Sequence, residues 1–369
     1  MDNGIKITLI DDLALLDNWR DEWEKLLCVS RPPHPFLLWT WIRLWAQRMS
    51  EEGNSPILLA VSRGGKTLAM IPLQVRKSGL LRVLEGFAQE FCDYIDWPAL
   101  PGVEKEVGQA FSVWLKDFSR YDYIRMYNLF PSGFAHAVLS GMTPGVVEEH
   151  SIAPQVPISG SFEDYVKSLN QKFYSDMKRR ERKLVKDKGP FEYKDAFGND
   201  ELPEVLDTIA SWLGSRLKSK GKSSYMERKG MKEHLVRLYG ELNDQKLLHL
   251  SAIKVQGRFA AINVAFKYEG GLYSYTPVFD PEFSPYSIIR ILKLRHIEQC
   301  FSSGMKVYDF CLGGEKYKLE FQPEIKQLYA FTRYNANLRG SIKKIFDSSV
   351  KPALKRSKLA HDIKEKYLK

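Results

Sequence analysis

Residues 271–318 constrain the fold of this 369-residue chain more than any other stretch. Residues 272–279 are rich in aromatic and β-branched side chains, which predicts a strand. The pair Ser284–Pro285 is typical of a helix start, with serine as the N-cap and proline at the first helical position. Apolar residues follow at helical spacing up to Gly304, a suitable helix end, and residues 307–312 predict a second strand.

A strand, a crossover helix and a second strand of this length predict two parallel strands joined by a right-handed crossover. In such a unit the first N–H groups of the helix point away from the carboxyl end of the first strand. These groups form a favourable site for phosphate or another anion. The stretch therefore predicts an anion site at the start of its helix.

The rest of the chain predicts a mixed α/β fold. A three-stranded antiparallel meander (247–254, 257–268, 271–279) precedes the crossover helix. The first half contains helices, a hairpin around Gly64–Gly65 and a short aromatic strand at 91–97. We expect a first domain over 1–158, a second over 159–336 and a basic tail over 337–369. Sequence similarity between the two halves is too weak to establish a duplication.

The net charge of +10 is concentrated in two segments. Residues 338–369 hold ten Lys or Arg against three acids, and residues 167–188 hold nine against three. The four cysteines are far apart and form no C-x-x-C pair, and the histidines form no H-E-x-x-H motif. We therefore expect neither disulfides nor a metal, and a cytoplasmic protein. No signal peptide and no apolar run of membrane-spanning length is visible.

Five blocks of the sequence, in this order, resemble a bacterial family of GNAT-like acyltransferases. The family is assigned to cellulose or capsule biosynthesis and is related to the FemABX peptidyltransferases. The blocks are Pro35–Trp39 with Trp41, Asp93–Tyr94 with Asp96, 161–165 leading to 178–184, Ser284–Tyr286, and 308–318. The last block, with Glu315-Lys-Tyr-Lys318 after Gly313, is the most specific. Tyr286 stands where the family commonly has glycine, and Phe321 where it commonly has tryptophan.

The resemblance implies a GNAT-like fold, with two such halves in tandem. It also implies transfer of an acyl group, with acetyl expected, from acyl-CoA to an amine or hydroxyl. The acceptor would be a sugar, a polysaccharide or another cell-envelope precursor. Acyl-CoA is the implied co-substrate, and no metal is implied.

Five residues are candidates for acyl-CoA binding. Ser284, Tyr286 and Ser287 lie where the helix start would hold the pyrophosphate, although an ordinary capped helix accounts for the same residues. Tyr275 and Thr276 lie on the preceding strand, whose backbone would pair with the pantetheine arm and polarise the thioester carbonyl. Packing in the strand is the alternative for these two.

Three residues are candidates for catalysis. Asp309 is an acid within an apolar strand. It is either a general base or a structural acid that accepts backbone N–H bonds or pairs with Lys318. Glu315 is a second candidate base, and Tyr317 is positioned to protonate the departing thiolate. For 315–318 as a whole, a solvated charged loop is the alternative.

Five residues are candidates for substrate binding. Lys318 is expected to contact phosphate or an anionic sugar. The forked guanidinium groups of Arg179 and Arg180 suit a nucleotide-sugar or a lipid-linked diphosphate, with a solvated helix face as the alternative. Asp93 and Asp96 are expected to line a cleft between the halves.

Two other functions are consistent with the same sequence. One is an aminoacyl-tRNA-dependent amino-acid transferase of FemX type, the one case in which a nucleic acid is expected as a partner. The other is a non-catalytic binding protein on a GNAT scaffold. The basic tail is either a solvated helix, an RNA-binding segment, or a contact with an anionic membrane through Ile342, Ile345, Phe346 and Val350. The last interpretation places the protein at the periphery of the inner membrane face.

Overall fold

The computed structural model describes residues 4–219 and 221–350. The chain divides into two compact units, each of which is discontinuous in sequence. Unit 1 comprises Met1–Arg31, Met49–His150 and Tyr329–Lys369, and unit 2 comprises Pro32–Arg48 and Ser151–Leu328. The expected domain boundaries therefore differ from these units. Residues 32–48 belong with the second half, and the described part of the expected tail, residues 337–350, belongs with the first half. Residues 351–369 of that tail lie outside the described residues.

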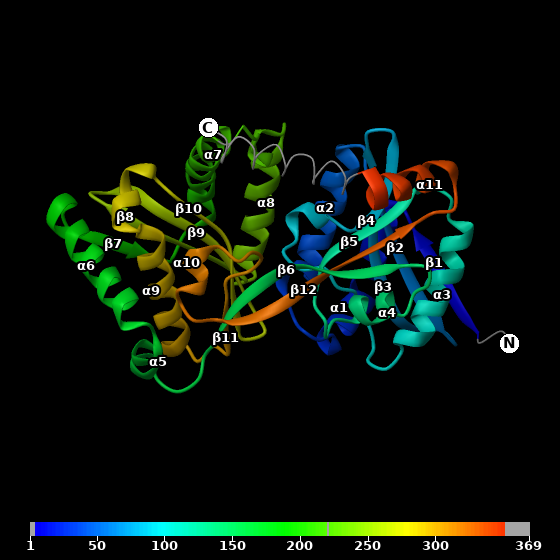
Figure 1. The fold of residues 1–369 in the computed structure, drawn as a ribbon, viewed down its shortest axis with the longest axis horizontal. Helices are drawn as coiled ribbons and strands as arrows, with labels where there is room; N and C mark the ends of the chain where they lie inside the picture. Colours follow the sequence, from blue (N-terminus) through cyan, green and yellow to red (C-terminus); the bar gives the residue numbers. More distant parts are fainter. Residues whose placement is uncertain (1–3, 220, 351–369) are drawn as a thin grey trace, which may run out of the picture. The chain divides into compact units, whose positions relative to one another are not determined.

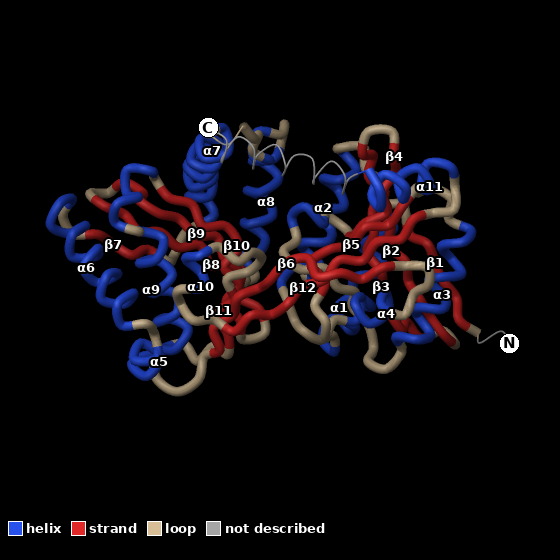
Figure 2. Tube along the Cα trace, in the orientation of Figure 1, coloured by secondary structure: helices blue, strands red, loops and turns tan. Residues whose placement is uncertain are grey.

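Unit 1 is built on a sheet with the strand order β1-β2-β3-β4-β5-β12 (Figures 1 and 2). Neighbouring strands are antiparallel except β4 and β5, which are parallel. The strands are β1 (Ile5–Ile10), β2 (Ser55–Arg63), β3 (Lys66–Ser78), β4 (Leu81–Gly86), β5 (Tyr123–Leu129) and β12 (Glu324–Tyr334). The helices are α1 (Arg20–Val29), α3 (Glu104–Asp117), α4 (Phe134–Ser140) and α11 (Leu338–Ile345).

The hairpin predicted in this unit is confirmed, and the strand predicted at 91–97 is wrong. Gly64 and Gly65 both have positive φ, as a two-residue hairpin turn of the I′ type requires. At 91–97 the chain instead leaves a short 3-10 helix (Gln89–Phe91) and makes a single β-bridge at Ile95. Aromatic side chains favour a strand in sequence, but here they fill the core: Phe91, Tyr94 and Trp97 are all buried.

Unit 2 has the strand order β6-β11-β10-β9-β8-β7. Its strands are β6 (Val146–Pro157), β7 (Phe191–Lys194), β8 (Leu248–Val255), β9 (Arg258–Tyr268), β10 (Gly271–Phe279) and β11 (Val307–Asp309). Its helices are α2 (Trp39–Glu51), α5 (Phe162–Ser168), α6 (Gln171–Lys188), α7 (Leu202–Lys218), α8 (Met231–Asp244), α9 (Ile288–Ser302) and α10 (Lys316–Leu319). The predicted meander and crossover helix are thus confirmed, and so is the mixed α/β class.

The helices of unit 2 cover both faces of its sheet. On β9, the side chain of Asn263 bonds to Lys293 of α9, whereas the ring of Phe266 packs on Tyr239 of α8. Because these two β9 residues are an odd number of positions apart, α9 and α8 lie on opposite faces. The rings of Phe36 and Trp41 also pack on Phe266, which explains why residues 32–48 belong to this unit.

The two halves of the chain repeat the same order of elements. From β1 in the first half and from β7 in the second, each runs through a strand, two helices, a three-stranded meander, a helix, a strand, a short helix and a last strand. In each, the third meander strand is parallel to the strand after the helix, as β4 to β5 and β10 to β11. The last strand of each half pairs with a strand of the other half: β6 pairs with β11, and β12 pairs with β5. The duplication is therefore visible in topology, although it was too weak to establish from sequence.

Candidate functional site

The two parallel strands of unit 2 separate after a short paired stretch. β10 and β11 pair only from Gly271↔Val307 to Tyr273↔Asp309. β10 continues to Phe279 with β9 as its partner, whereas the chain after β11 turns away at Cys311, whose φ is +58°. The backbone of β10 beyond Tyr273 is therefore the edge of an opening between two strands.

A β-bulge lies on β10 at this opening. The register between β10 and β9 shifts between Ser274 and Thr276, so Tyr275 is the additional residue. A bulge leaves one residue out of the ladder and redirects its backbone groups. The ring of Tyr275 packs against Phe36, with centroids 5.6 Å apart, so this side chain contributes to packing. Any role of Tyr275 in binding an acyl donor therefore rests on its backbone.

The helix start predicted at Ser284 is wrong. Asp280 caps a 3-10 helix over Pro281–Tyr286, and α9 begins only at Ile288. Ser287, in the left-handed region with φ of +53°, is the N-cap of α9 and makes no side-chain cap. The pair Ser284–Pro285 is compatible with a 3-10 turn as well as with the first turn of an α-helix. The pattern therefore placed the start of α9 too early.

Tyr286, which stands at the usual glycine position, does not project over the start of α9. Its side chain is buried in a core cluster with Phe283. Its hydroxyl lies 3.3 Å from Asp187, and the Lys183 ammonium lies over its ring. Tyr286 therefore anchors the loop to α6.

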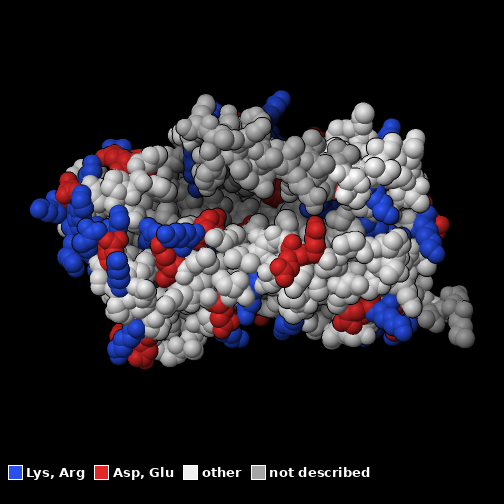
Figure 3. Space-filling view, viewed as in Figure 1, with Lys and Arg blue, Asp and Glu red and all other residues white. Residues whose placement is uncertain are grey.

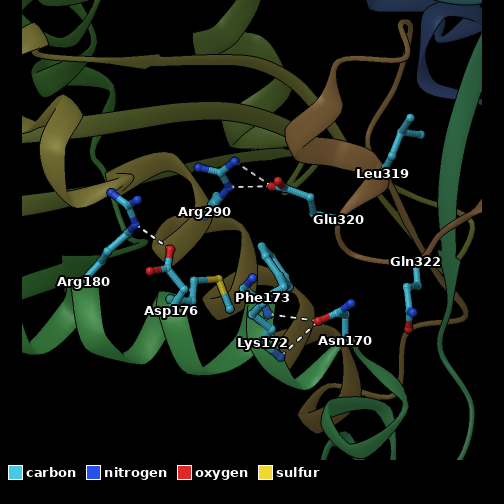
Figure 4. Close-up of a pocket in the computed structure, with 10 residues that line it drawn as sticks. Asn170, Lys172, Phe173, Asp176, Arg180, Arg290, Leu319, Glu320 and Gln322 are labelled. Carbon is cyan, nitrogen blue, oxygen red and sulfur yellow. Dashed lines mark hydrogen bonds and ion pairs between the residues drawn. The ribbon is translucent and has the colours of Figure 1, made fainter.

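A cavity of about 530 Å³ opens between α6, the first turn of α9 and the segment after α10 (Figure 4). We call it the α6–α9 cavity. Its lining residues are Asn170, Lys172, Phe173, Asp176, Met177, Arg180, Arg290, Leu319, Glu320 and Gln322. Of the residues predicted for the site, only Arg180 is among them.

Two guanidinium groups are fixed at this cavity next to the start of α9. Arg180 donates to the Pro285 carbonyl at 2.8 Å and to Asp176 at 2.7 Å. Arg290 pairs with Glu320 at 2.6 Å and donates to the Ser287 hydroxyl at 3.1 Å. Figure 4 shows both arginines on the same side of the cavity, each held by its own carboxylate. A helix start and two positioned arginines form a site suited to phosphate groups.

Asp309 is fully buried, and both oxygens of its carboxylate accept a hydrogen bond. One accepts the backbone N–H of Cys311 at 2.7 Å, and the other accepts the Gln155 side-chain amide at 2.8 Å. Asp309 is also the register partner of Tyr273, whose hydroxyl donates to the Pro33 carbonyl. Burial, and then the charge of Asp309, raise the pKa of Tyr273. This arrangement favours the structural interpretation of Asp309 over that of a general base.

The residues after β11 form a compact charged turn. Lys318 is 5% exposed, donates to the Leu312 carbonyl at 2.6 Å and pairs with Glu315 at 2.9 Å. The Glu315 side chain is 58% exposed, so it remains accessible to a ligand. Burial, and then the charge of Glu315, raise the pKa of Tyr317, so this phenol stays protonated at neutral pH. Glu315 and Tyr317 are thus an accessible carboxylate and a proton-bearing phenol two residues apart in sequence.

The remaining predicted substrate residues lie elsewhere. The exposed Arg179 pairs with Asp176 at 2.5 Å and is not among the cavity-lining residues. Asp93 and Asp96 belong to unit 1. Asp96 is buried, and its carboxylate accepts the N–H groups of Trp97, Phe134 and Ala135, which fixes the start of α4. Burial raises the pKa of Asp96 to about 7.

Sequence reasoning missed Arg290 and Lys293, both on α9. Arg290 is the charged residue in the first turn of α9, and that position was the available signal. Lys293 is 1% exposed and donates to Asn263 at 2.7 Å and to the hydroxyl of Ser274, beside the bulge. Burial, and then the charge of Lys318, hold the pKa of Lys293 well below its usual value.

Residues 171–319 match a family described as "Acetyltransferase (GNAT) domain". This segment contains most of the cavity wall, α9 and the turn after β11, and its match agrees with the sequence resemblance. A search of curated protein sequences finds no match to this chain.

Several solved structures share the fold over most of the chain. A conserved protein of unknown function from Bacteroides thetaiotaomicron is 13% identical with a TM-score of 0.54, over 89% of this chain and 100% of that one. FemX is 10% identical with a TM-score of 0.57, over 84% and 95%. L-PGS from Bacillus licheniformis is 13% identical with a TM-score of 0.55, over 86% and 93%. These likenesses span both units and, with the repeated topology, confirm two GNAT-like halves in tandem.

Proposed function

We propose that this chain is an acyltransferase that moves an acyl group, expected to be acetyl, from acyl-CoA to an amine or hydroxyl. The observation that carries the proposal is the separation of β10 from β11, with a bulge at Tyr275 and the start of α9 beside it. An extended acyl carrier entering this opening would meet backbone groups of β10 along its length. Its phosphates would meet the start of α9 with Arg180 and Arg290.

The chemistry assigned to the residues follows from their environment. The acceptor amine or hydroxyl attacks the thioester carbonyl, and the backbone N–H of Tyr275 is proposed to stabilise the oxyanion that forms. Glu315, accessible and next to Lys318, is proposed to take the proton from the acceptor. Tyr317 is proposed to donate a hydrogen bond to the departing thiolate. Complete proton transfer is not required, because a thiol with a pKa of about 8.5 is a stronger acid than a tyrosine.

The remaining predicted residues keep supporting roles. Thr276, Ser284 and Ser287 are proposed to lie along the acyl donor, and Lys318 to orient Glu315. The acceptor is proposed to be a sugar, a polysaccharide or another cell-envelope precursor, and the enzyme to act in the cytoplasm. Asp93 and Asp96 stay predictions as acceptor-binding residues. Among the described residues, no helix is long and apolar enough to cross a bilayer.

Calorimetric titration with acetyl-CoA and with CoA tests the donor. We expect binding by the intact chain, and at least tenfold weaker binding by Arg290→Gln, since one guanidinium is lost from the phosphate site. Arg295→Gln is the matched control. It removes an arginine of the same helix that pairs with Glu181 and Glu298 outside the cavity lining. Absence of binding at millimolar acetyl-CoA contradicts the proposal.

A FemX-type transferase, with aminoacyl-tRNA as donor, is a second candidate. The structural likeness to FemX supports it, and so does the basic surface of α6, where Figure 3 shows Lys and Arg gathered at the far end of unit 2. Most of these cations already have acidic partners, as in Lys178–Glu181, Lys183–Asp187 and Lys188–Glu282. The second candidate predicts salt-sensitive tRNA binding in place of CoA binding.

A further inference from the structure

Helix α11 of unit 1 presents its apolar side to solvent. Leu338 is 77% exposed, Ile342 57%, Ile345 61% and Phe346 43%. Leu338, Ile342 and Ile345 are four and three positions apart, so they share one face of α11, and Phe346 is the first residue after the helix. Surface helices normally bury their apolar face, whereas α11 exposes this face to solvent.

The opposite side of α11 is fixed to unit 1 by polar contacts. Gly340 is buried so closely that a Cβ atom there would lie 2.4 Å from the carbonyl oxygens of Asn335 and Asp122. One turn later, Asp347 accepts from Lys343 at 2.7 Å and from the Tyr334 hydroxyl at 2.9 Å. The helix is therefore held in place with its apolar face outward.

A second element extends the apolar surface. Arg339 of α11 donates to the carbonyl of Leu80, at the tip of the β3–β4 hairpin, at 3.2 Å. Leu80 is 87% exposed. Two segments far apart in sequence thus contribute to one surface, formed by Leu80, Leu338, Ile342, Ile345 and Phe346. We call it the α11 patch.

Cations surround the α11 patch. Arg339, Lys344 and Lys77 of the hairpin are all exposed. Figure 3 shows uncharged surface over α11 with Lys and Arg side chains beside it. Asp347, which follows α11, is already paired with Lys343. The sequence that continues from this helix, residues 351–369, holds seven Lys or Arg against two acids.

We propose that the α11 patch is a docking surface for an anionic lipid bilayer. Exposed leucine, isoleucine and phenylalanine insert among acyl chains at the interface, and surrounding lysine and arginine attract anionic headgroups. The charge of the surroundings favours a bilayer over a second copy of this chain, because two such patches would bring like charges together. The proposal does not depend on the acyl donor.

Sedimentation of the full chain with vesicles tests the proposal. Vesicles of phosphatidylcholine alone are compared with vesicles that also contain phosphatidylglycerol, at low and high salt. We expect binding to the anionic vesicles, weakened by salt, and little binding to the neutral ones. The variant Leu338→Ser/Ile342→Ser/Ile345→Ser is expected to bind the anionic vesicles at least tenfold more weakly.

Val113→Ser, which changes a 59% exposed apolar residue on α3, is the matched control and is expected to bind like the unchanged chain. Three outcomes overturn the proposal. The first is that the full chain does not bind anionic vesicles. The second is that the triple variant binds them as well as the unchanged chain. The third is that the chain self-associates in ultracentrifugation and the triple variant is monomeric, which would make a second copy the occupant.

Discussion

At the scale of single residues, the feature that departs most from the sequence expectations is Lys293. A lysine in an apolar helix would ordinarily extend its ammonium to water, yet this one is buried against the sheet. Its partners, Asn263 and Ser274, are neutral, so nothing on β9 or β10 compensates a positive charge. Burial of an uncompensated charge is costly, and it holds the pKa of Lys293 well below the ordinary lysine value.

Lys293 is therefore predicted to make folding pH-dependent. Its pKa is depressed in the folded state, so between that lowered pKa and the ordinary lysine pKa only the unfolded chain takes up the proton. Within this window stability rises with pH, by as much as about 1.4 kcal/mol per pH unit. Urea unfolding at several pH values is expected to show this slope in the unchanged chain and its loss in Lys293→Met. An unchanged slope in that variant contradicts the prediction. Lys306→Met, at an exposed lysine, serves as the control.

A second prediction concerns the contribution of Asp96 to stability. Its carboxylate accepts three backbone N–H groups at the start of α4. Asp96→Ala leaves these donors buried and is expected to lower the free energy of unfolding by about 1–3 kcal/mol. Thermal unfolding measures the loss. If the variant unfolds like the unchanged chain but has lost acceptor binding, the carboxylate serves the substrate and not the fold.

At the scale of elements, the position of α11 depends on one glycine. Gly340 has no room for a side chain, because the nearest obstacles are backbone oxygens that cannot rotate away. Gly340→Val is therefore expected to release α11 from unit 1. Limited proteolysis should then cut near this helix at least several-fold faster than in the unchanged chain. Equal cleavage rates would mean that α11 is held by its other contacts. Ser341→Val, at an exposed position on the same helix, is the control.

The long periodic elements were also those that the sequence predicted well. The meander of unit 2 and the apolar run of the crossover helix were predicted from their spacing, and both are present in the structure. The start of α9 was misplaced by three or four residues, because a 3-10 turn and a first helical turn use the same capping residues. The strand expected at 91–97 is absent. Its aromatic side chains fill the core, and aromatic content alone does not distinguish a buried loop from a strand.

At the scale of the whole molecule, the family resemblance predicted the fold, and the site only in part. It identified the block from Asp309 to Lys318 and the helix-start loop, which are contiguous in sequence. It could not identify the α6–α9 cavity, because Arg180, Arg290 and Glu320 are separated by up to 140 residues and meet only in the folded unit. It also could not show that the last strand of each half pairs with a strand of the other half, because strand pairing is visible only in the folded structure.

The central claim is that the start of α9 and the opening beside β10 hold an acyl-CoA. A crystal structure of the chain with bound CoA tests this claim most directly. We expect the pyrophosphate at the first turn of α9, within hydrogen-bonding distance of the Arg290 guanidinium, and the pantetheine arm along β10 beyond Tyr273. Density for CoA at any other place, or a site that accepts an aminoacyl-tRNA end while CoA is not bound, would contradict it.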